Sequence, residues 1–239
     1  MPEISKTADQ ALAVLEYVAE HGPIGTSDLA RRLKMHRTVV HRLLATLQGR
    51  GFVRRIADGY LPGIALLKVA QYVEPELLAA ARPVLETLAR THGETFILTV
   101  PNDDEAIQIE QSVGSHHFVR VQLARGFRHP LAKGASGRSI LAFMPEAAVE
   151  RIVACDEDPK RLRKLLAEVR RDGYAVSRDE LSPGVYGISV PVLLDDVPAA
   201  SLGVVFPAVR AGDLATYGKI LSKAAATVAH ALQRAEASD

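Results

Sequence analysis

The chain has 239 residues, 48% of them hydrophobic, so length and composition predict one large or two ordinary folded domains and argue against general disorder. The single cysteine, Cys155, excludes an intramolecular disulfide, and the absence of a signal-peptide core and of an apolar run of about 18 residues favours a cytoplasmic protein with no membrane partner. The net charge is only +1, but residues 1–73 carry +4 and residues 74–239 carry −3, which predicts a polyanion-binding part joined to a part with another role.

The first fifty residues predict a helix-turn-helix. Thr7 opens a capping box, and the helix that follows is expected to end at Gly22. Thr26 is expected to cap a second helix. A third helix, from about Thr38 to Arg50, has an apolar stripe on one side and polar residues on the other. This arrangement suits a recognition helix, because one side holds the domain while the other enters the major groove.

A two-stranded hairpin is predicted directly after these helices. Asp58-Gly59 separates two short strand-like runs, and glycine tolerates the positive φ of a type I′ turn. Arg54 and Arg55 then lie on a wing strand, where one of them faces the DNA phosphates. Phosphate contacts supply affinity and position, and base contacts supply sequence choice.

Positive charge is concentrated in this same segment. Between Leu29 and Ala57 the chain has eight Arg or Lys residues and no Asp or Glu. A basic, folded winged helix favours DNA binding, although a winged-helix module that binds only protein is the alternative. The residues expected to contact DNA are Ser27, His36, Arg37, Thr38, His41, Arg42, Arg54 and Arg55.

The rest of the chain predicts a linker helix and an α+β domain. Residues 62–73 are apolar at helical spacing, and Pro75 marks a boundary. Helices are expected at about 77–91, 136–143, 146–155 and 160–171, with a last one capped by Asp213. Strands are expected at about 95–100, 106–113, 118–123, 174–177, 186–193 and 199–206. Hairpin-length loops between these strands indicate a mostly antiparallel sheet.

No assembled catalytic or metal motif is visible, and no cofactor is expected. The segment Gly134-Ala135-Ser136-Gly137 is one residue short of a nucleophile elbow. It fits equally a turn whose N–H groups receive an anion and a helix start that needs small residues for packing. His116 and His117 are adjacent in an expected strand and so face opposite sides. Cys155 is expected to be a buried structural thiol.

Taken together, the chain resembles the IclR family of bacterial transcription regulators. The matching segments are ALAVLEYVAEHGPIGTSDLARRLKMHRTVVHRLLATLQGRGFVRR and DGYLPGIALLKVA in the N-terminal part, and GFRHPLAKGASGRSILAFMP and RRDGYAVSRDELSPGVYGISVPV in the C-terminal part. The resemblance implies a winged helix-turn-helix at residues 1–61, a linker helix at 62–74, and a GAF-like effector-binding and oligomerisation domain at 75–239. It also implies dimers, or dimers of dimers, on palindromic double-stranded operators.

The resemblance further implies a pocket for a small organic acid or aromatic metabolite. Carried over to this chain, the effector-binding residues are Lys133, Gly134, Ala135, Ser136, Ser177, Asp179, Gly187 and Ser189. Three positions depart from the common family pattern. Lys133 falls within Ala132-Lys133-Gly134, where many members have His-Ala-Thr or His-Ala-Ser; Ser177 replaces an acid and Gly187 a cysteine. Lys133 favours an anion if it turns inward, and is a solvated lysine if it turns outward.

The leading hypothesis is therefore a ligand-responsive, non-enzymatic transcription regulator of a metabolic, in particular catabolic, operon. Two alternatives remain at this point. The C-terminal domain is an enzyme or sensor acting on a small acid through Ser136, or the winged helix is a protein-binding scaffold.

Overall fold

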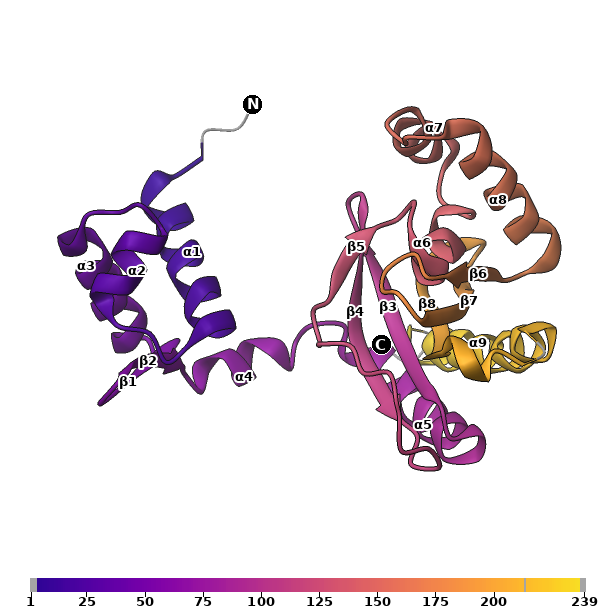
Figure 1. The fold of residues 1–239 in the computed structure, drawn as a ribbon, viewed down its shortest axis with the longest axis horizontal. Coiled ribbons are helices and arrows are strands. Elements are labelled where there is room, and N and C mark those ends of the chain that lie inside the picture. The colour runs from indigo at the N-terminus through magenta and orange to yellow at the C-terminus, as the bar shows by residue number, and fades with distance from the viewer. Residues whose placement is uncertain (1–3, 213, 237–239) are drawn as a thin grey trace. The chain divides into compact units, whose positions relative to one another are not determined.

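The structure is a computed structural model that describes residues 4–212 and 214–236. The chain divides into two compact units between Pro75 and Glu76. Among the described residues, no helix is both long and apolar enough to cross a lipid bilayer. The first unit contains three helices and a hairpin followed by a short fourth helix, and the second contains a six-stranded sheet with helices on both faces (Figure 1).

The first unit is the predicted winged helix-turn-helix. Its elements are α1 (Lys6–His21), α2 (Thr26–Arg32), α3 (Arg37–Gly49), β1 (Val53–Ile56) and β2 (Gly59–Pro62). The apolar stripes of the three helices meet in one core, which the aromatic ring of Tyr60 closes from the wing. Tyr60 also pairs with Ile24, so the hairpin is attached to the segment before α2. Packing and backbone pairing therefore hold the wing against the helices.

Local details of this unit differ from the sequence predictions. The N-cap residues are Ser5 and Gly25, so Thr7 and Thr26 lie inside the helices that they were expected to cap. The type I′ turn is also wrong. Ile56 pairs directly with Gly59, and the positive φ of +139° belongs to Gly59, which lies just after the two loop residues. The wing strand continues to Pro62, one residue beyond the expected boundary at 61.

The linker segment is only partly helical. Helix α4 covers Ala65–Ala70, six residues of the expected 62–74, and has no buried residue. The large apolar side chains at the ends and outer side of this segment are exposed: Ile64, Leu67, Val69, Tyr72 and Val73. A single turn and a half of helix leaves this apolar surface uncovered within the chain.

The second unit begins with α5 (Pro75–His92) and contains one antiparallel sheet in the order β5-β4-β3-β8-β7-β6. Its strands are β3 (Thr95–Asn102), β4 (Glu105–Val113), β5 (Arg128–Pro130), β6 (Ala175–Arg178), β7 (Val185–Leu194) and β8 (Val197–Pro207). The remaining helices are α6 (Gly134–Leu141), α7 (Glu146–Ala154), α8 (Pro159–Asp172), the short η1 (Ala208–Arg210) and α9 (Leu214–Glu236). The predicted α+β fold is confirmed.

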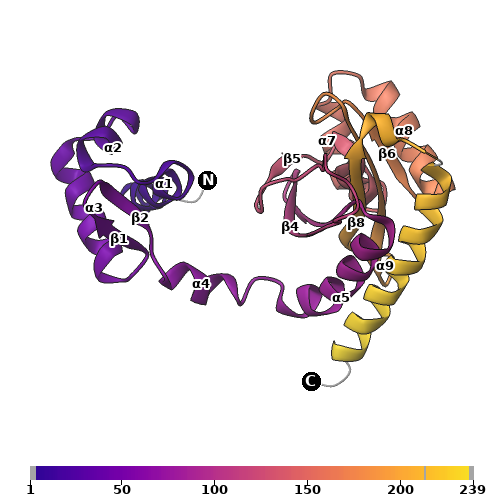
Figure 2. The ribbon, with the colours of Figure 1, turned by 60° about the horizontal axis from the view of Figure 1, so that its bottom comes forward.

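The two faces of this sheet have different chemistry. Helices α5 and α9 cover one face over a large apolar core that includes Phe96 and Leu98, while α6, with α7 and α8 beyond it, covers the other (Figure 1 and Figure 2). Because side chains alternate along a strand, Thr95, Ile97 and Thr99 of β3 point to the α6 face. The sheet thus has an apolar side and a side that carries hydroxyl groups.

Three predictions for this unit are wrong. Residues 114–127 form no strand, although one was expected at 118–123. Side chains replace the strand ladder there: the Gln111 amide binds both backbone groups of Leu123, and the Thr95 hydroxyl donates to the Val121 carbonyl. His116 and His117 consequently lie in a loop. Cys155 is exposed, because it follows the end of α7.

The expected cap of the last helix, Asp213, lies outside the described residues.

Candidate functional site

The outer side of α3 carries the side chains expected to read DNA. Val40, Leu43, Leu44 and Leu47 are buried against the other helices. The opposite face is exposed at His36, Arg37, Thr38, His41 and Arg42. His36 is the N-cap, so this set occupies the first turn and a half of the helix. The N-terminal part of a recognition helix is the part that reaches base edges.

The wing and α2 add further exposed groups. Arg54 and Arg55 are both exposed on β1, and Ser27 is exposed in the first turn of α2. Arg55 pairs with buried Tyr60 and therefore shares its face, so Arg54 points to the other face of the hairpin. The wing therefore presents positive charge on both of its faces.

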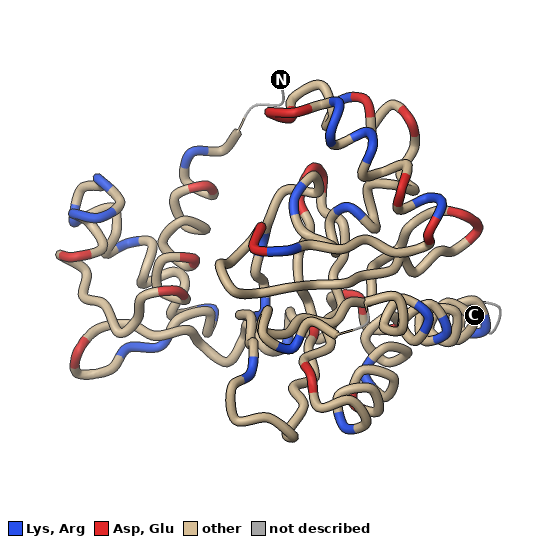
Figure 3. The backbone as a smooth tube through the Cα atoms, turned by 45° about the vertical axis from the view of Figure 1, so that its right-hand side comes forward, with Lys and Arg blue, Asp and Glu red and all other residues tan. Residues whose placement is uncertain are grey.

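The positive charge of this surface is largely free. Within the part of the chain that the structure describes, Arg37, Arg42, Arg54 and Arg55 form no ion pair, whereas Arg31 is paired with Asp28 at 2.5 Å. Figure 3 shows the Lys and Arg positions along the backbone in blue. Unneutralised arginines on a compact surface are available to replace the counterions of a phosphate backbone.

A second site lies on the hydroxyl-bearing face of the sheet. It is a cavity of about 30 Å³ between β3, β4, β7, β8 and the start of α6. Its polar lining residues are Thr99, Gln108, His129, Ser136, Ser177 and Ser189, and its other lining residues are Ile97, Leu123, Phe127, Ala135, Leu181, Gly187 and Val205. Such a volume holds about two water molecules. An aromatic acid therefore requires Leu181 or the 114–127 loop to move outward.

The structure brings together five of the eight residues expected at the effector site: Ala135, Ser136, Ser177, Gly187 and Ser189. Gly134 stands at the edge, with φ +76°, and a Cβ there would meet Leu181 at 2.7 Å. Asp179 does not line the cavity. Its carboxylate accepts a hydrogen bond from Gly184 N–H at 2.7 Å and shapes the loop between β6 and β7.

Lys133 is directed away from this cavity. It lines a separate pocket of about 200 Å³ between the start of α6 and the α7–α8 connection. The other charged lining residues there are Arg138, Asp156, Glu157, Asp158, Arg161 and Glu180. Of the two alternatives for Lys133, the structure has the one in which it turns away from the sheet cavity, and neither Lys133 nor Asp179 lines that cavity.

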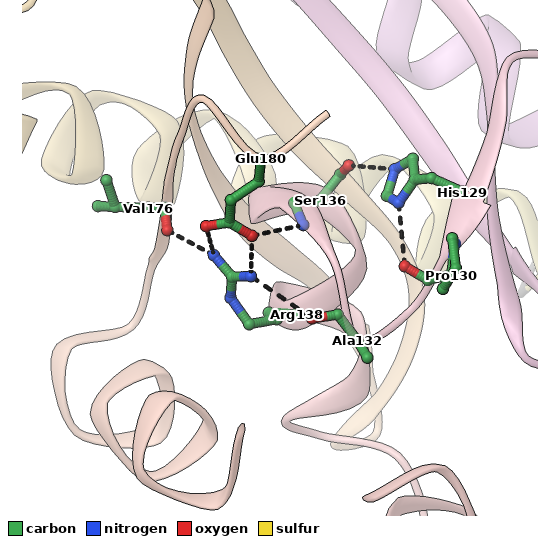
Figure 4. A network of polar contacts seen from close by, with 8 residues as sticks. His129, Pro130, Ala132, Ser136, Arg138, Val176 and Glu180 are labelled. Carbon is green, nitrogen blue, oxygen red and sulfur yellow. Dashed lines mark hydrogen bonds and ion pairs between the residues drawn. The ribbon is translucent and has the colours of Figure 1, made fainter. Parts of the chain in front are cut away.

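His129 is the titratable group of the cavity. Burial lowers its pKa, and the neutral ring is held from both sides (Figure 4). Nδ1 lies 3.1 Å from the Pro130 carbonyl oxygen and Nε2 lies 3.1 Å from Ser136 Oγ. Since a carbonyl only accepts, the proton is assigned to Nδ1, and the Ser136 hydroxyl donates to Nε2. The cavity therefore contains no charged side chain near neutral pH.

An ion pair between a buried arginine and a partly exposed glutamate fixes the loop above the cavity. Arg138, on α6, is 3% exposed and binds the carboxylate of Glu180 through both terminal nitrogens, at 2.5 and 2.7 Å (Figure 4). The same carboxylate accepts from Gly134 N–H at 3.1 Å, at the start of α6. Glu180 directly precedes Leu181, whose side chain lines the cavity. The ion pair thus connects the β6–β7 loop, which covers the cavity, to α6, which forms part of the cavity wall.

Two departures from the family pattern turn out to be neighbours. Ser177 and Gly187 are direct partners across β6 and β7. A Cβ at Gly187 would lie 3.0 Å from Ser177 Oγ, so a larger residue there forces the hydroxyl to move. The serine at 177 and the glycine at 187 are therefore sterically coupled, because the size of one limits the size of the other.

Sequence reasoning missed Thr99, Gln108, His129, Arg138, Glu180 and Leu181. Strand alternation was sufficient to place Thr99 on the α6 face. Gln108 could not be found in this way, because a β-bulge at Ile109 reverses the alternation of β4. His129, Arg138, Glu180 and Leu181 stand inside the matched segments, but their roles depend on contacts between distant parts of the chain.

Among the residues at 4–212 and 214–236, no group of three or more His, Cys, Asp or Glu side chains could hold a metal ion. The winged helix and the sheet cavity are the two places where most of the residues expected to contact DNA and effector come together.

Comparison with known proteins agrees with this two-part reading. The model of the IclR helix-turn-helix domain matches residues 7–57, and the model of the bacterial transcriptional regulator IclR C-terminal domain matches residues 70–230. The chain is 32% identical to the HTH-type transcriptional regulator KipR of Bacillus subtilis, over 80% of this chain and 82% of that protein. It is 28% identical to the transcriptional repressor IclR of Escherichia coli, over 92% and 87% of the two chains.

A solved structure shares the whole fold. It is an IclR homolog from Microbacterium hydrocarbonoxydans complexed with 4-hydroxybenzoate, with a TM-score of 0.84 and 25% identity over 96% of this chain and 100% of that chain.

Proposed function

The chain belongs to the IclR family and is a ligand-responsive, DNA-binding transcription regulator, and we propose that it senses a small organic acid in the sheet cavity. The observation that supports this proposal is the uncharged, hydroxyl-lined cavity beside the start of α6. The Microbacterium homolog is complexed with 4-hydroxybenzoate, an aromatic acid, which supports an acid as the class of effector. We further propose that the regulated genes serve a metabolic, in particular catabolic, pathway.

Each part of the chain is given the function of the site that it contains. We assign DNA binding to residues 1–61, a linker role to 62–74, and effector binding and self-association to 75–239. Ser27, His36, Arg37, Thr38, His41, Arg42, Arg54 and Arg55 are the proposed DNA contacts, supported by their exposure and by the four unpaired arginines among them. Because bacterial DNA lies in the cytoplasm, we place the protein there.

Self-association on palindromic operator DNA is part of the proposal. A symmetric dimer matches a palindrome, because each winged helix then reads one half-site. The exposed apolar residues around α4, including Leu67 and Tyr72, provide surface that association would cover. Light scattering with size-exclusion chromatography tests this point, and a monomer at micromolar concentration contradicts it.

The effector-binding residues that we propose are Ala135, Ser136, Ser177, Gly187 and Ser189, with Gly134 shaping the entrance. An acid here is held by the hydroxyl donors of Ser177 and Ser189, by Ser136 once its hydroxyl turns from His129 to the ligand, and by the positive end of the α6 dipole. A thermal-shift screen of aromatic and short-chain acids tests the proposal. Stabilisation by at least one acid, lost in Ser136→Ala, supports it, whereas no shift with any acid contradicts it.

An enzymatic role has one observation in its favour, the hydrogen bond between Ser136 Oγ and His129 Nε2. The His129 ring is oriented by the neutral Pro130 carbonyl, whereas a catalytic histidine of this type uses a carboxylate to stabilise its imidazolium form. We therefore propose binding without turnover. Release of product from the bound acid, abolished by Ser136→Ala, would overturn that choice.

A further inference from the structure

The floor of the cavity contains polar side chains that have no partner. Thr99 Oγ1 and both heteroatoms of the Gln108 amide are buried and make no hydrogen bond. Thr99 is 1% exposed and Gln108 is 2% exposed, and both line the cavity. A buried amide or hydroxyl left unpaired costs about 1–3 kcal/mol, so such groups are rare in folded proteins. No other protein group among the described residues pairs with these atoms, so a ligand that displaces water from the cavity is the partner left to satisfy them.

Backbone geometry turns these two side chains to the same place. Thr99 and Gln108 are direct partners across β3 and β4, so their side chains share one face of the sheet. The bulge at Ile109 is what allows this. Glu110, two residues further along, faces Arg82 of α5 at 2.8 Å on the opposite side. Without the bulge, Gln108 and Glu110 would share a face.

The backbone of Gln108 is also fixed. Its N–H donates to the Phe127 carbonyl at 3.0 Å, and its carbonyl accepts from Gly126 N–H at 2.8 Å. The loop that carries Phe127, another lining residue, thereby holds the amide against the cavity. A side chain that is positioned from the strand, the bulge and the loop is preorganised for a ligand.

The chemistry of these groups defines what they accept. The Gln108 amide offers two donors and one acceptor site, and the Thr99 hydroxyl both donates and accepts. A carboxylate only accepts, so beside Gln108 it leaves the amide carbonyl oxygen unpaired. A ligand hydroxyl both donates and accepts, so it satisfies the amide without adding charge.

We infer that Gln108 and Thr99 form a hydroxyl-recognition site, which makes the effector a hydroxy-substituted carboxylic acid. Its carboxylate lies toward Ser136 and the start of α6, and its hydroxyl lies on Gln108 and Thr99. This inference rests on the proposed function, since it specifies the class of acid that the same cavity binds.

The test is a calorimetric titration of the full-length protein with acids matched in pairs that differ by one hydroxyl group. The probes are 4-hydroxybenzoate and benzoate, lactate and propionate, and 3-hydroxybutyrate and butyrate. For wild type, the hydroxylated member of at least one pair binds about tenfold tighter or more, because its absence leaves buried polar groups unpaired. Equal affinity within every pair that binds overturns the inference and leaves the acid proposal intact.

Two variants and a control assign the preference to these residues. Gln108→Met and Thr99→Val are close in shape, remove the unpaired groups and leave thermal stability unchanged or higher. Together they reduce the preference for the hydroxylated acid to within about twofold. Ser201→Ala is the matched control, because Ser201 Oγ is also buried and unpaired beside Thr99 but does not line the cavity.

Retention of the preference in the double variant overturns the inference, as does its loss in Ser201→Ala. If no acid of any pair binds wild type, both the inference and the acid proposal fail.

Discussion

Arg138 of α6 and Glu180 of the β6–β7 loop form a bidentate ion pair in which the arginine is buried and the glutamate is partly exposed. The Arg138 guanidinium also donates to the Val176 carbonyl at 2.6 Å, so one buried arginine joins α6, β6 and the loop that covers the cavity. Removing Glu180 leaves the buried charge of Arg138 uncompensated, which destabilises the fold more than the loss of a surface ion pair does.

Glu180→Gln is expected to lower the free energy of unfolding by about 3 kcal/mol at neutral pH, because Arg138 loses its counter-charge. The loop that carries Leu181 is then held less firmly, so ligand dissociation becomes faster. Urea denaturation and stopped-flow ligand release measure the two effects. Glu150→Gln is the matched control, since Glu150 pairs with Arg163 on an exposed surface. Equal losses in both variants contradict the assigned role.

The stability from this ion pair depends on pH. Burial alone raises the pKa of Glu180, but the hydrogen bonds and charge of Arg138 and the N–H of Gly134 lower that pKa overall. Its contribution is therefore present above the unfolded pKa of about 4.3 and is lost as pH falls through the lower folded pKa. The stability difference between wild type and Glu180→Gln should shrink below about pH 4. A constant difference down to about pH 2 contradicts this.

His129 gives the cavity a second pH dependence. Burial lowers the pKa of His129, so the folded protein binds this proton less readily than the unfolded chain does. The stabilisation is full above the unfolded pKa of about 6.5 and declines as pH falls toward the lower folded pKa. Wild type should lose more stability than His129→Gln over that interval in chemical denaturation. Identical profiles for wild type and His129→Gln disprove the prediction.

Gly187→Ala is expected to weaken acid binding about tenfold and to cost about 1 kcal/mol of stability, because the added Cβ lies 3.0 Å from Ser177 Oγ. The second substitution Ser177→Gly should restore most of both losses, since it removes the crowded hydroxyl. Calorimetric titration and thermal denaturation of the single and double variants measure this coupling. Additive losses in the double variant show that the two positions are independent.

The arginines of the winged helix are expected to have two different roles, base recognition and phosphate binding. Arg42→Ala should reduce the preference for operator over random DNA by about tenfold or more, because a base contact is lost. Arg55→Ala should weaken all sequences similarly and lower the salt dependence by about one counterion. Arg50→Ala, at the far end of α3, is the control and should change little. Fluorescence anisotropy at several salt concentrations separates these outcomes, and equal behaviour of Arg42→Ala on both DNAs contradicts the assignment.

Particular elements show how much of the fold could be predicted from the sequence. Helix α3 and the wing were predictable, because Leu43, Leu44 and Leu47 recur at helical spacing and Asp58-Gly59 marks the hairpin. The strand expected at 118–123 was not correct, since the side chains of Thr95 and Gln111 bind its backbone in place of a ladder. Local pattern cannot reveal a partner that is contributed from a distant strand.

The candidate site shows the same limit. Ser136, Ser177 and Ser189 were found through the family resemblance, and the structure places them around one cavity. Gln108 was missed because the bulge at Ile109 changes the face of the sheet on which its side chain lies, and no residue type in β4 predicts that bulge. Glu180 was missed because its role depends on an ion pair with Arg138, which lies 42 positions earlier in the chain.

The most direct test of the account is the affinity of the full-length protein for DNA from its own promoter region, measured by anisotropy with and without a saturating acid from the binding screen. The account predicts that the acid changes this affinity about fivefold or more, the usual scale of coupling between two sites. It also predicts that Ser136→Ala, which still binds the DNA, responds only at much higher acid concentration. An affinity that stays the same when the cavity is saturated would contradict the account, because a ligand that binds both states equally shifts nothing.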